Sequence, residues 1–361
     1  MSDYDLNDNI ETRELPEETQ RELLLTYLTS HKMVYIQDFL KDRGLAYSYR
    51  KSELPGRLTE YLDAGEFELS DLVELLNTIE GWGKQQIYLY NAPGALSARW
   101  RDPAFVRQQL QEAGYLDLLN QSKPLILPVE PTLSTIQFNE GVIRFIWIER
   151  RTWRVRLPDE DREGRIERAT DNDLPSSLIQ DQIVWQAYRV RMARGLIVFE
   201  WNLNTNDAMM LIQQLPSGRQ YKALRDQFEG YLRQFFAIDS FDKVRLSSAL
   251  PGIENSGETR RQHMTFRSTD NRGKIAVTSP RKDQDVFDND TVVNRARVAV
   301  GGDATGLLGN FHWLENGGRP DTEVYTQIYG EDDDDQRVGI LAEHTEENVR
   351  YVLSRIRHHC V

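Results

Sequence analysis

Closely spaced basic side chains are the residues of this sequence with the clearest chemistry. Arg50 and Lys51 are adjacent, and Arg57 follows six residues after Lys51. Between Lys32 and Arg57 there are six basic residues and three acids, so this stretch carries a charge of +3 in a chain whose net charge is −13. Guanidinium and ammonium groups bind phosphate oxygens. The stretch therefore predicts a local contact with a phosphate backbone; the alternative is an ordinary solvated helix surface.

A second basic group falls in two segments that alternate as strands do. Arg154 and Arg156 alternate with apolar residues in one segment, and Arg189 and Arg191 do so in the other. Because successive side chains of a strand point to opposite faces, each segment can present its arginines on one face. If the two strands pair, we expect four guanidinium groups on one surface. Residues 260–282 add seven basic residues against a single acid. Together these segments predict a further groove for a phosphate backbone, although a charged solvent face is the alternative.

Acidic side chains offer one possible catalytic arrangement. Asp171 and Asp173, together with Glu200 on a predicted strand, are similar to the acids of a metal-dependent nuclease. The lysine expected two positions after Glu200 is Asn202, which disfavours this interpretation. The sequence has no GxxxxGK[ST] phosphate loop and no GxGxxG segment after a strand. The histidines are isolated, apart from the pair His358-His359, which would need outside ligands to bind a metal. We therefore expect no catalytic residues, no metal and no cofactor.

Composition limits the class of protein. The chain has 361 residues, of which 39% are hydrophobic and 28% are charged, so we expect two folded units. No apolar run reaches the roughly 18 to 20 residues that span a bilayer, and the acidic N-terminus is unlike a secretory signal. The single cysteine, Cys360, excludes an internal disulfide and agrees with a reducing compartment. We expect a soluble protein of the cytoplasm, nucleoid or nucleus that has no membrane partner.

Much of the negative charge is concentrated in two segments. Residues 1–22 carry eight acids against Arg13 and Arg21, and residues 331–335 are five consecutive acids. Blocks of like charge repel themselves and stay solvated. We therefore interpret them as a solvated tail and a solvated loop, and the rest of the chain is nearly neutral.

The first 122 residues predict an all-helical domain. Helical spacing of apolar residues begins at Pro16 and recurs over residues 34–43, 52–64, 70–79 and 103–119. Asp102-Pro103 is a typical helix start, in which the aspartate caps the first turn. Prolines at 124, 128 and 131 then indicate an extended linker.

Residues 123–361 predict a mixed α+β domain with a mainly antiparallel sheet. Branched and aromatic residues indicate strands over 142–149, 152–157, 183–194, 196–201, 262–267, 274–278, 296–300, 324–329 and 338–342. Helices are expected over 206–215, 218–237 and 346–357, and a loop over 250–259. Strands interrupted by helices without a regular βαβ order are typical of the α+β class.

The order of elements in residues 33–64 is informative. An amphipathic helix ends near Gly44, an extended stretch follows, and a second helix starts near Ser52. This arrangement resembles the SAP module, a short DNA-binding motif, at Phe39-Leu40, Arg43-Gly44-Leu45, Lys51, Leu54 and Arg57-Leu58. The resemblance implies that Arg50, Lys51 and Arg57 meet phosphates, helped by Lys41 or Arg43. Pro55 is compatible with it only if it falls in the first turn of the second helix.

The layout of the whole chain has a broader resemblance. A helical N-terminal part with the Arg50-Lys51 pair is followed by Ile-Tyr-Leu-Tyr at 87–90 and by an Arg-Phe-Ile-Trp strand at 144–147. This layout is similar to that of the centromere protein N family, whose members dock on nucleosomal DNA and pair with a partner protein. The resemblance implies DNA contacts only for Arg50 and Lys51.

These observations lead to one main expectation and two alternatives. We expect a non-catalytic DNA-binding adaptor that contacts the phosphate backbone and has a protein partner. The alternatives are a nucleic-acid-processing enzyme, such as a divergent nuclease, and a protein-docking scaffold that does not bind DNA.

Overall fold

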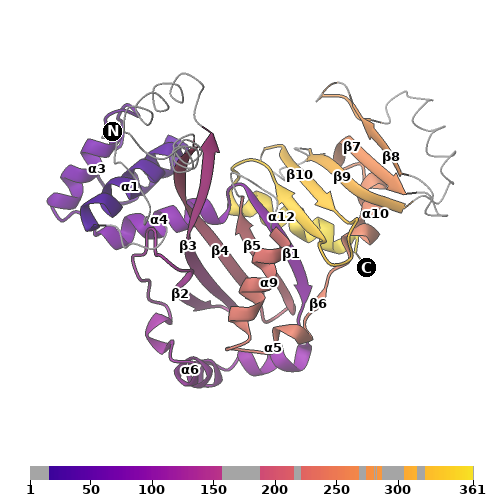
Figure 1. The fold of residues 1–361 in the computed structure, drawn as a ribbon, viewed down its shortest axis with the longest axis horizontal. Helices are drawn as coiled ribbons and strands as arrows, with labels where there is room; N and C mark the ends of the chain where they lie inside the picture. The colour runs from indigo at the N-terminus through magenta and orange to yellow at the C-terminus, as the bar shows by residue number, and fades with distance from the viewer. Residues whose placement is uncertain are drawn as a thin grey trace, which may run out of the picture.

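Helices occupy the first part of the chain and recur among the strands that follow. The computed structural model describes residues 16–156, 188–214, 221–267, 274–279, 281, 283–286, 305–314 and 322–360, without the side chains of residues 153–156, 188–192 and 305–306. The α-helices are α1 Glu17–Ser30, α2 Met33–Asp42, α3 Leu54–Asp63, α4 Leu69–Gly81, α5 Gly94–Trp100, α6 Pro103–Glu112, α9 Tyr221–Leu232, α10 Ala249–Asn255 and α12 Glu346–His358. The first four lie together at one end of the molecule (Figure 1).

The strands of the described residues form one large antiparallel sheet. They are β1 Gln85–Asn91, β2 Thr132–Asn139, β3 Val142–Arg156, β4 Tyr188–Asn202, β5 Asp207–Gln213, β6 Asp242–Lys243, β7 Thr259–Arg267, β8 Lys274–Thr278, β9 Thr305–Trp313, β10 Val324–Tyr329 and β11 Arg337–Ile340. Their order is β2-β3-β4-β5-β1-β11-β10-β9-β7-β8, and β6 pairs with β1. The fold is therefore α+β, as the sequence predicted: a helical first part followed by a part rich in sheet.

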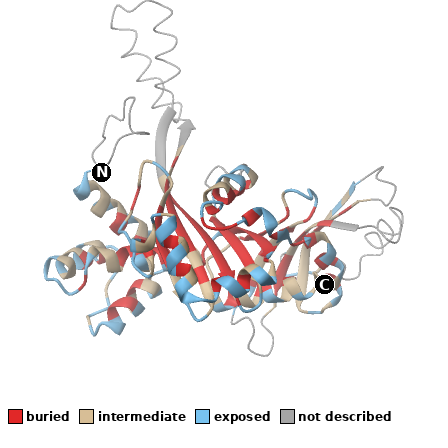
Figure 2. Ribbon diagram, turned by 90° about the horizontal axis from the view of Figure 1, so that it is seen from below, coloured by how far each residue is buried: buried red, intermediate tan, exposed pale blue. Residues whose placement is uncertain are grey.

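Helices cover both faces of this sheet, and β1 shows the alternation that results. Ile87 and Leu89 pack with the buried residues of α10 and α12, whereas Tyr88 and Tyr90 pack with those of α5, α6 and α9. Successive side chains of a strand leave opposite faces, so one strand serves two cores. Figure 2 shows the strands as the most buried part of the molecule. A third core, with Leu28 and Leu72 among its fully buried members, joins α1 to α4.

The helical part ends earlier than predicted. Residues 85–91 were expected to belong to a helical domain ending at residue 122, but they form β1, which lies between β5 and β11. Its residues from Gln85 to Tyr90 are all buried. Periodicity alone cannot separate so short a buried run from a buried helix. The helices after β1, α5 and α6, pack on the sheet rather than on α1 to α4.

Two other predicted elements are wrong. The helix expected over residues 206–215 is strand β5, whose central residues are all buried because the sheet is covered on both faces. The loop expected over residues 250–259 is helix α10 followed by the start of β7. Pro251 lies in the first turn of α10, where its missing N–H removes no helical hydrogen bond.

Other predictions are confirmed. Strands β8 and β10 have the bounds expected from the sequence, and α12 spans residues 346–358. Asp102 caps α6, because its Oδ1 accepts a hydrogen bond from the backbone N–H of Ala104 at 2.9 Å. The strand predicted over residues 296–300 lies outside the described residues.

Candidate nucleic-acid interface

The segment from α2 to α3 has the order of elements that the sequence predicted. Helix α2 ends at Asp42, residues 45–50 have no regular secondary structure, and α3 begins at Leu54. Gly44 has a φ of 70°, and the N–H groups of Gly44 and Leu45 donate to the carbonyls of Lys41 and Leu40 at 2.9 Å each. This left-handed cap satisfies the last carbonyls of α2 and turns the chain into the segment between the helices, here called the link (residues 45–50).

The start of α3 differs in one detail from the prediction. Glu53, and not Ser52, precedes the first helical residue, and its Oε2 accepts a hydrogen bond from the backbone N–H of Arg50 at 3.0 Å. Pro55 is the second residue of the helix, so it lies in the first turn, where proline is tolerated.

Tyrosines hold the link against α3. The Oη atom of Tyr61 lies 2.9 Å from that of Tyr49 and 3.3 Å from the carbonyl oxygen of Ala46. Leu54 and Leu58 of α3 are fully buried in the core of the four helices. The position of the link, and of the basic residues that follow it, is therefore determined by buried and hydrogen-bonded groups.

Arg50 and Lys51 lie where the link enters α3, and both are exposed. Neither forms an ion pair with a carboxylate of the described chain; Lys51 Nζ lies 3.4 Å from the carbonyl oxygen of His31. The backbone N–H of Arg50 is bonded to Glu53, but its guanidinium is not. The two residues are thus adjacent cations whose charges are not neutralised by a neighbouring acid within the part of the chain that the structure describes.

Arg57 is placed close to them but is partly neutralised. Its Nη1 atom donates to Oε2 of Glu60 at 2.5 Å, and both side chains are about half exposed. Its guanidinium carbon lies 5.3 Å from the centre of the Tyr49 ring, which keeps Arg57 beside the link. An exposed ion pair of this kind is weak and can be exchanged for a phosphate contact.

Lys41 and Arg43 are exposed at the other end of α2. Lys51 contacts His31, two residues before α2 begins, whereas Lys41 and Arg43 lie at the end of α2. The ten-residue helix therefore separates the two groups by about 15 Å. Arg43 also pairs with Asp71 at 3.4 Å and lies over the ring of Phe39. The structure therefore does not bring Lys41 and Arg43 into the group formed by Arg50, Lys51 and Arg57.

The four arginines of the second predicted group lie on paired strands, but not on one face. Strands β3 and β4 pair in antiparallel register, with Arg154 opposite Val190 and Arg189 opposite Val155. Residues directly opposite each other in such a pair lie on the same face. Arg154 and Arg156 therefore belong to one face, and Arg189 and Arg191 to the other. The expectation of four guanidinium groups on one surface is wrong, because it depended on a register that the sequence alone did not give.

Glu200, considered above as a metal ligand, is held by two arginines. Its Oε1 accepts from Arg350 at 2.8 Å, and its Oε2 accepts from Arg350 and Arg144 at 2.6 Å each. Burial by itself would raise the pKa of this carboxyl, but hydrogen bonds from Arg350 and the charge of Arg144 lower the pKa below its ordinary value. Asp171 and Asp173 lie outside the described residues, and the described residues contain no cluster of three or more potential metal ligands.

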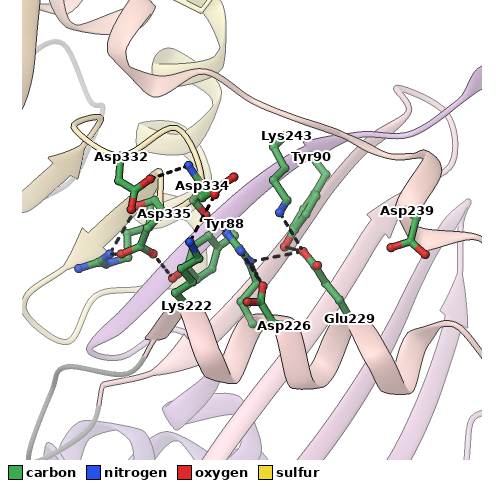
Figure 3. A network of polar contacts seen from close by, with 12 residues as sticks. Tyr88, Tyr90, Lys222, Asp226, Glu229, Asp239, Lys243, Asp332, Asp334 and Asp335 are labelled. Atoms are coloured by element: carbon green, nitrogen blue, oxygen red, sulfur yellow. Dashed lines mark hydrogen bonds and ion pairs between the residues drawn. The ribbon is translucent and has the colours of Figure 1, made fainter.

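The acidic run at residues 331–335 is exposed from Glu331 to Asp334, as expected of a solvated loop, and it is also tied to the fold. The hydroxyl of Tyr88 donates to Asp335 at 2.6 Å, and Lys222 lies 3.4 Å from Asp334 (Figure 3). Arg225, whose side chain is 3% exposed, donates to the backbone carbonyl of Asp334. Figure 3 places these groups between β1, α9 and the acidic loop. The sequence did not predict this contact, because Tyr88 and Tyr90 were expected to belong to the helical domain.

A related contact joins α9 to β1. The hydroxyl of Tyr90 donates to Oε1 of Glu229 at 2.9 Å, and Arg225 and Lys243 approach the same oxygen at 3.5 and 3.9 Å. These groups satisfy one another in a largely buried position, so they hold the helix on the sheet and offer no free charge to a ligand.

A small cavity lies beside Glu200, between α4 and strands β3 and β4. Its volume is about 80 Å³, and Trp82, Arg144 and Glu346 are among the residues that line it. Space of this size holds a few water molecules. Arg144 on its wall already pairs with Glu200 and Glu346, so it is not available as a site for a charged ligand.

None of the helices described has both the length and the apolar character needed to cross a bilayer. No protein-family model matches the chain, and a comparison with curated proteins gives no significant match.

Proposed function

We propose that this protein is a non-catalytic DNA-binding adaptor that contacts the phosphate backbone through Arg50 and Lys51. One observation carries the proposal: the two cations are adjacent and exposed, and no acid of the described chain pairs with either of them. Many other arginines are already neutralised, as Arg350 is by Glu200 and Arg355 is by Glu258. A cation without a partner gains most from a phosphate, because it gives up no existing ion pair.

The negative charge of the whole molecule is compatible with this proposal. The net charge of −13 repels a polyanion at long range. At physiological ionic strength, charges separated by more than about 8 Å are largely screened. Once the molecules meet, the acids far from the link contribute little, and the local balance around Arg50 and Lys51 determines binding.

The surroundings of the pair add support. The helix, link and helix of residues 33–63 match the order of elements in the SAP module, and Arg57 lies beside the link within reach of a neighbouring phosphate. Arg154, Arg156, Arg189 and Arg191 lie on the paired strands β3 and β4 but not on one face, so the proposal does not rest on them. Lys41 and Arg43, at the far end of α2, extend the contact only if the DNA follows that helix.

The test is binding of a fluorescent duplex of about 20 base pairs, followed by anisotropy at two salt concentrations. Reversing Arg50 and Lys51 together to glutamate should weaken binding at least about tenfold and reduce the salt dependence, because fewer counterions are released. A double variant with the same change in net charge, Lys84→Glu with Arg107→Glu, alters exposed residues elsewhere and should bind as the wild type does. Equal losses in the two variants would mean that overall charge, and not this site, governs binding.

The same measurements separate the alternatives. A protein-docking scaffold is favoured by Val34 and Tyr47, the large apolar residues that are most exposed in the described chain, at 47% and 44%. A scaffold would bind no duplex at low salt. A nuclease would cleave it in the presence of a divalent metal, and Glu200→Gln would abolish that cleavage.

A further inference from the structure

Tyr47 is an exposed aromatic residue of the link that the fold does not use. Its side chain belongs to none of the three cores. Within the described chain it takes part in no side-chain hydrogen bond, ring contact or cation–π contact. The neighbouring Tyr49 differs, because its hydroxyl lies 2.9 Å from that of Tyr61 and Arg57 lies over its ring. Tyr49 and Tyr61 therefore hold the link on α3, and the ring of Tyr47 is left exposed.

The backbone of Tyr47 is held on both sides. The carbonyl oxygen of Ala46 lies 3.3 Å from the hydroxyl of Tyr61, and the N–H of Tyr49 donates to the carbonyl oxygen of Tyr47 at 3.2 Å. A ring whose backbone is already fixed loses less conformational freedom when a ligand packs on it. Tyr47 is thus preorganised for a contact.

Tyr47 also lies close to the two cations that are proposed to bind phosphate. Arg50 follows it by three residues and Lys51 by four. A chain spans at most about 3.6 Å per residue, so the Cα atoms of Tyr47 and Arg50 are no more than about 11 Å apart. A single exposed tyrosine is ordinary on a protein surface. Beside two cations that no acid of the described chain neutralises, it gives the site a flat apolar part and a positive part.

The exposed apolar side chains support this location. Among the described residues the large ones are Val34 and Tyr47, and both belong to the segment from α2 to α3. Val34 lies in the first turn of α2, three residues after His31, whose carbonyl oxygen lies 3.4 Å from Lys51 Nζ. Exposed apolar groups and unneutralised cations therefore occur together in this segment.

A nucleotide presents both kinds of group that such a site would bind. Its base has a flat face that stacks on an aromatic ring, and its phosphate is bound by arginine or lysine. In a duplex each base is stacked between its neighbours, so an enzyme or binding protein reaches a base face only after paying for unstacking. In a single strand the base faces are accessible without this cost. The site therefore favours a single strand over a duplex.

We infer that Tyr47 stacks on an unpaired base of single-stranded DNA, while Arg50 and Lys51 bind phosphates of the adjacent nucleotides. This inference rests on the proposed function, and it specifies the form of DNA and the residue that selects it. A duplex offers the same phosphates but no free base face, so it is bound by the two cations alone and therefore more weakly.

The experiment uses the full chain, the duplex described above and one of its separated strands. The wild type should bind the strand more tightly than the duplex. Tyr47→Ala should weaken binding of the strand at least about fivefold, because one base loses its stacking partner, and it should leave binding of the duplex unchanged. Tyr47→Phe keeps the ring and should bind both as the wild type does. Val34→Ala is the matched control: it shortens the other exposed apolar side chain but removes no ring, so the preference for the strand should remain.

The salt dependence separates stacking from charge. Tyr47 is uncharged, so Tyr47→Ala should lower the affinity for the strand without changing the slope of log affinity against log salt. Reversing Arg50 and Lys51 should reduce that slope for both the strand and the duplex. Circular dichroism of each variant checks that it is folded.

A photochemical crosslink reports on the contact itself. A strand with 5-iodouracil in place of thymine should crosslink to Tyr47 under ultraviolet light, since this base reacts with an aromatic side chain on which it stacks. Mass spectrometry of the peptides locates the crosslink. A crosslink confined to other residues would contradict the stacking.

The outcomes are distinct from those that test the proposed function. Equal losses for strand and duplex in Tyr47→Ala, no loss for either, or tighter binding of the duplex by the wild type would overturn the inference. If the reversal of Arg50 and Lys51 removes binding and Tyr47→Ala binds normally, the proposed function stands and the stacking falls. If neither strand nor duplex binds at low salt, both fall, and Val34 and Tyr47 are left as a surface for a protein partner.

Discussion

Arg194 of β4 and Glu80 of α4 form an ion pair at the boundary between the helical part and the sheet, and only 1% and 4% of the two side chains are exposed. The same guanidinium donates to Asn77, one turn earlier on α4. The Nε atom of Arg194 is buried without a hydrogen-bond partner. The pair therefore determines how α4 sits on the sheet, at an appreciable cost in desolvation.

Replacing Arg194 alone with methionine should lower the free energy of unfolding by about 3 to 5 kcal/mol, because it leaves the buried Glu80 carboxylate without its partner. The double variant Arg194→Met with Glu80→Leu should lose much less, since neither charge then remains buried. Urea unfolding followed by circular dichroism measures both. A double variant as unstable as the single one would show that the ion pair itself contributes net stability.

Gly195 precedes the point where β4 joins β5, and a methyl group there would overlap the Arg151 guanidinium. Gly195→Ala should destabilise the protein by about 1 to 3 kcal/mol through overpacking. Gly56 offers the matched control: it lies in α3, and nothing approaches its missing methyl group within 4 Å. Gly56→Ala should raise the free energy of unfolding by about 0.5 to 1 kcal/mol, as alanine favours the helix. Thermal melts of both variants should show a lower melting temperature than wild type for Gly195→Ala and a higher one for Gly56→Ala.

Glu60→Gln removes the carboxylate that pairs with Arg57. If Arg57 belongs to the DNA contact, its release from Glu60 should tighten duplex binding by about two- to fivefold. This factor corresponds to the free energy of an exposed ion pair. Glu74→Gln, an exposed glutamate of α4, removes the same charge away from the link and should change affinity less. Equal effects of the two substitutions in anisotropy titrations would exclude a direct role for Arg57.

Glu200 makes stability depend on pH in the acid range. Its pKa is lowered in the folded protein, despite burial, by Arg350 and Arg144. The contribution of Glu200 to the free energy of unfolding is therefore complete above its pKa in the unfolded chain, about 4.3. It is lost as the pH falls through the pKa in the folded protein. Glu200→Gln should cost about 1.5 to 3 kcal/mol near pH 7. In urea titrations the difference between wild type and variant should shrink below about pH 4; a difference that stayed constant would contradict this assignment.

Buried tyrosines make stability depend on pH in the alkaline range. Burial raises the pKa of Tyr27 to about 12, helped by the charge of Glu80. The pKa of Tyr88 is raised by burial and by its hydrogen bond to Asp335. When folding raises the pKa of a tyrosine, the contribution of that tyrosine to the free energy of unfolding is complete below its pKa in the unfolded chain, about 10. The contribution declines as the pH rises above that value. Unfolding between about pH 10 and 12 should therefore accompany tyrosine ionisation at 295 nm, and Tyr88→Phe should weaken this dependence.

Residues near one another in the chain determined the parts that the sequence predicted well. Gly44 ends α2 and Pro55 lies in the first turn of α3, so the helix, link and helix follow from local backbone preferences. Asp102 caps α6 for the same reason. These features need no distant partner, and the sequence was sufficient to locate Arg50 and Lys51 between the helices.

Only the tertiary structure decided the features that depend on distant partners. A buried run such as β5 has no periodicity that separates strand from helix, and its neighbours β4 and β1 made it a strand. Glu200 meets Arg350, which is 150 residues away, and this contact turned a possible metal ligand into an ion pair. The register of β3 and β4 placed Arg154 and Arg189 on opposite faces, because a shift of one residue in pairing changes the face of every side chain.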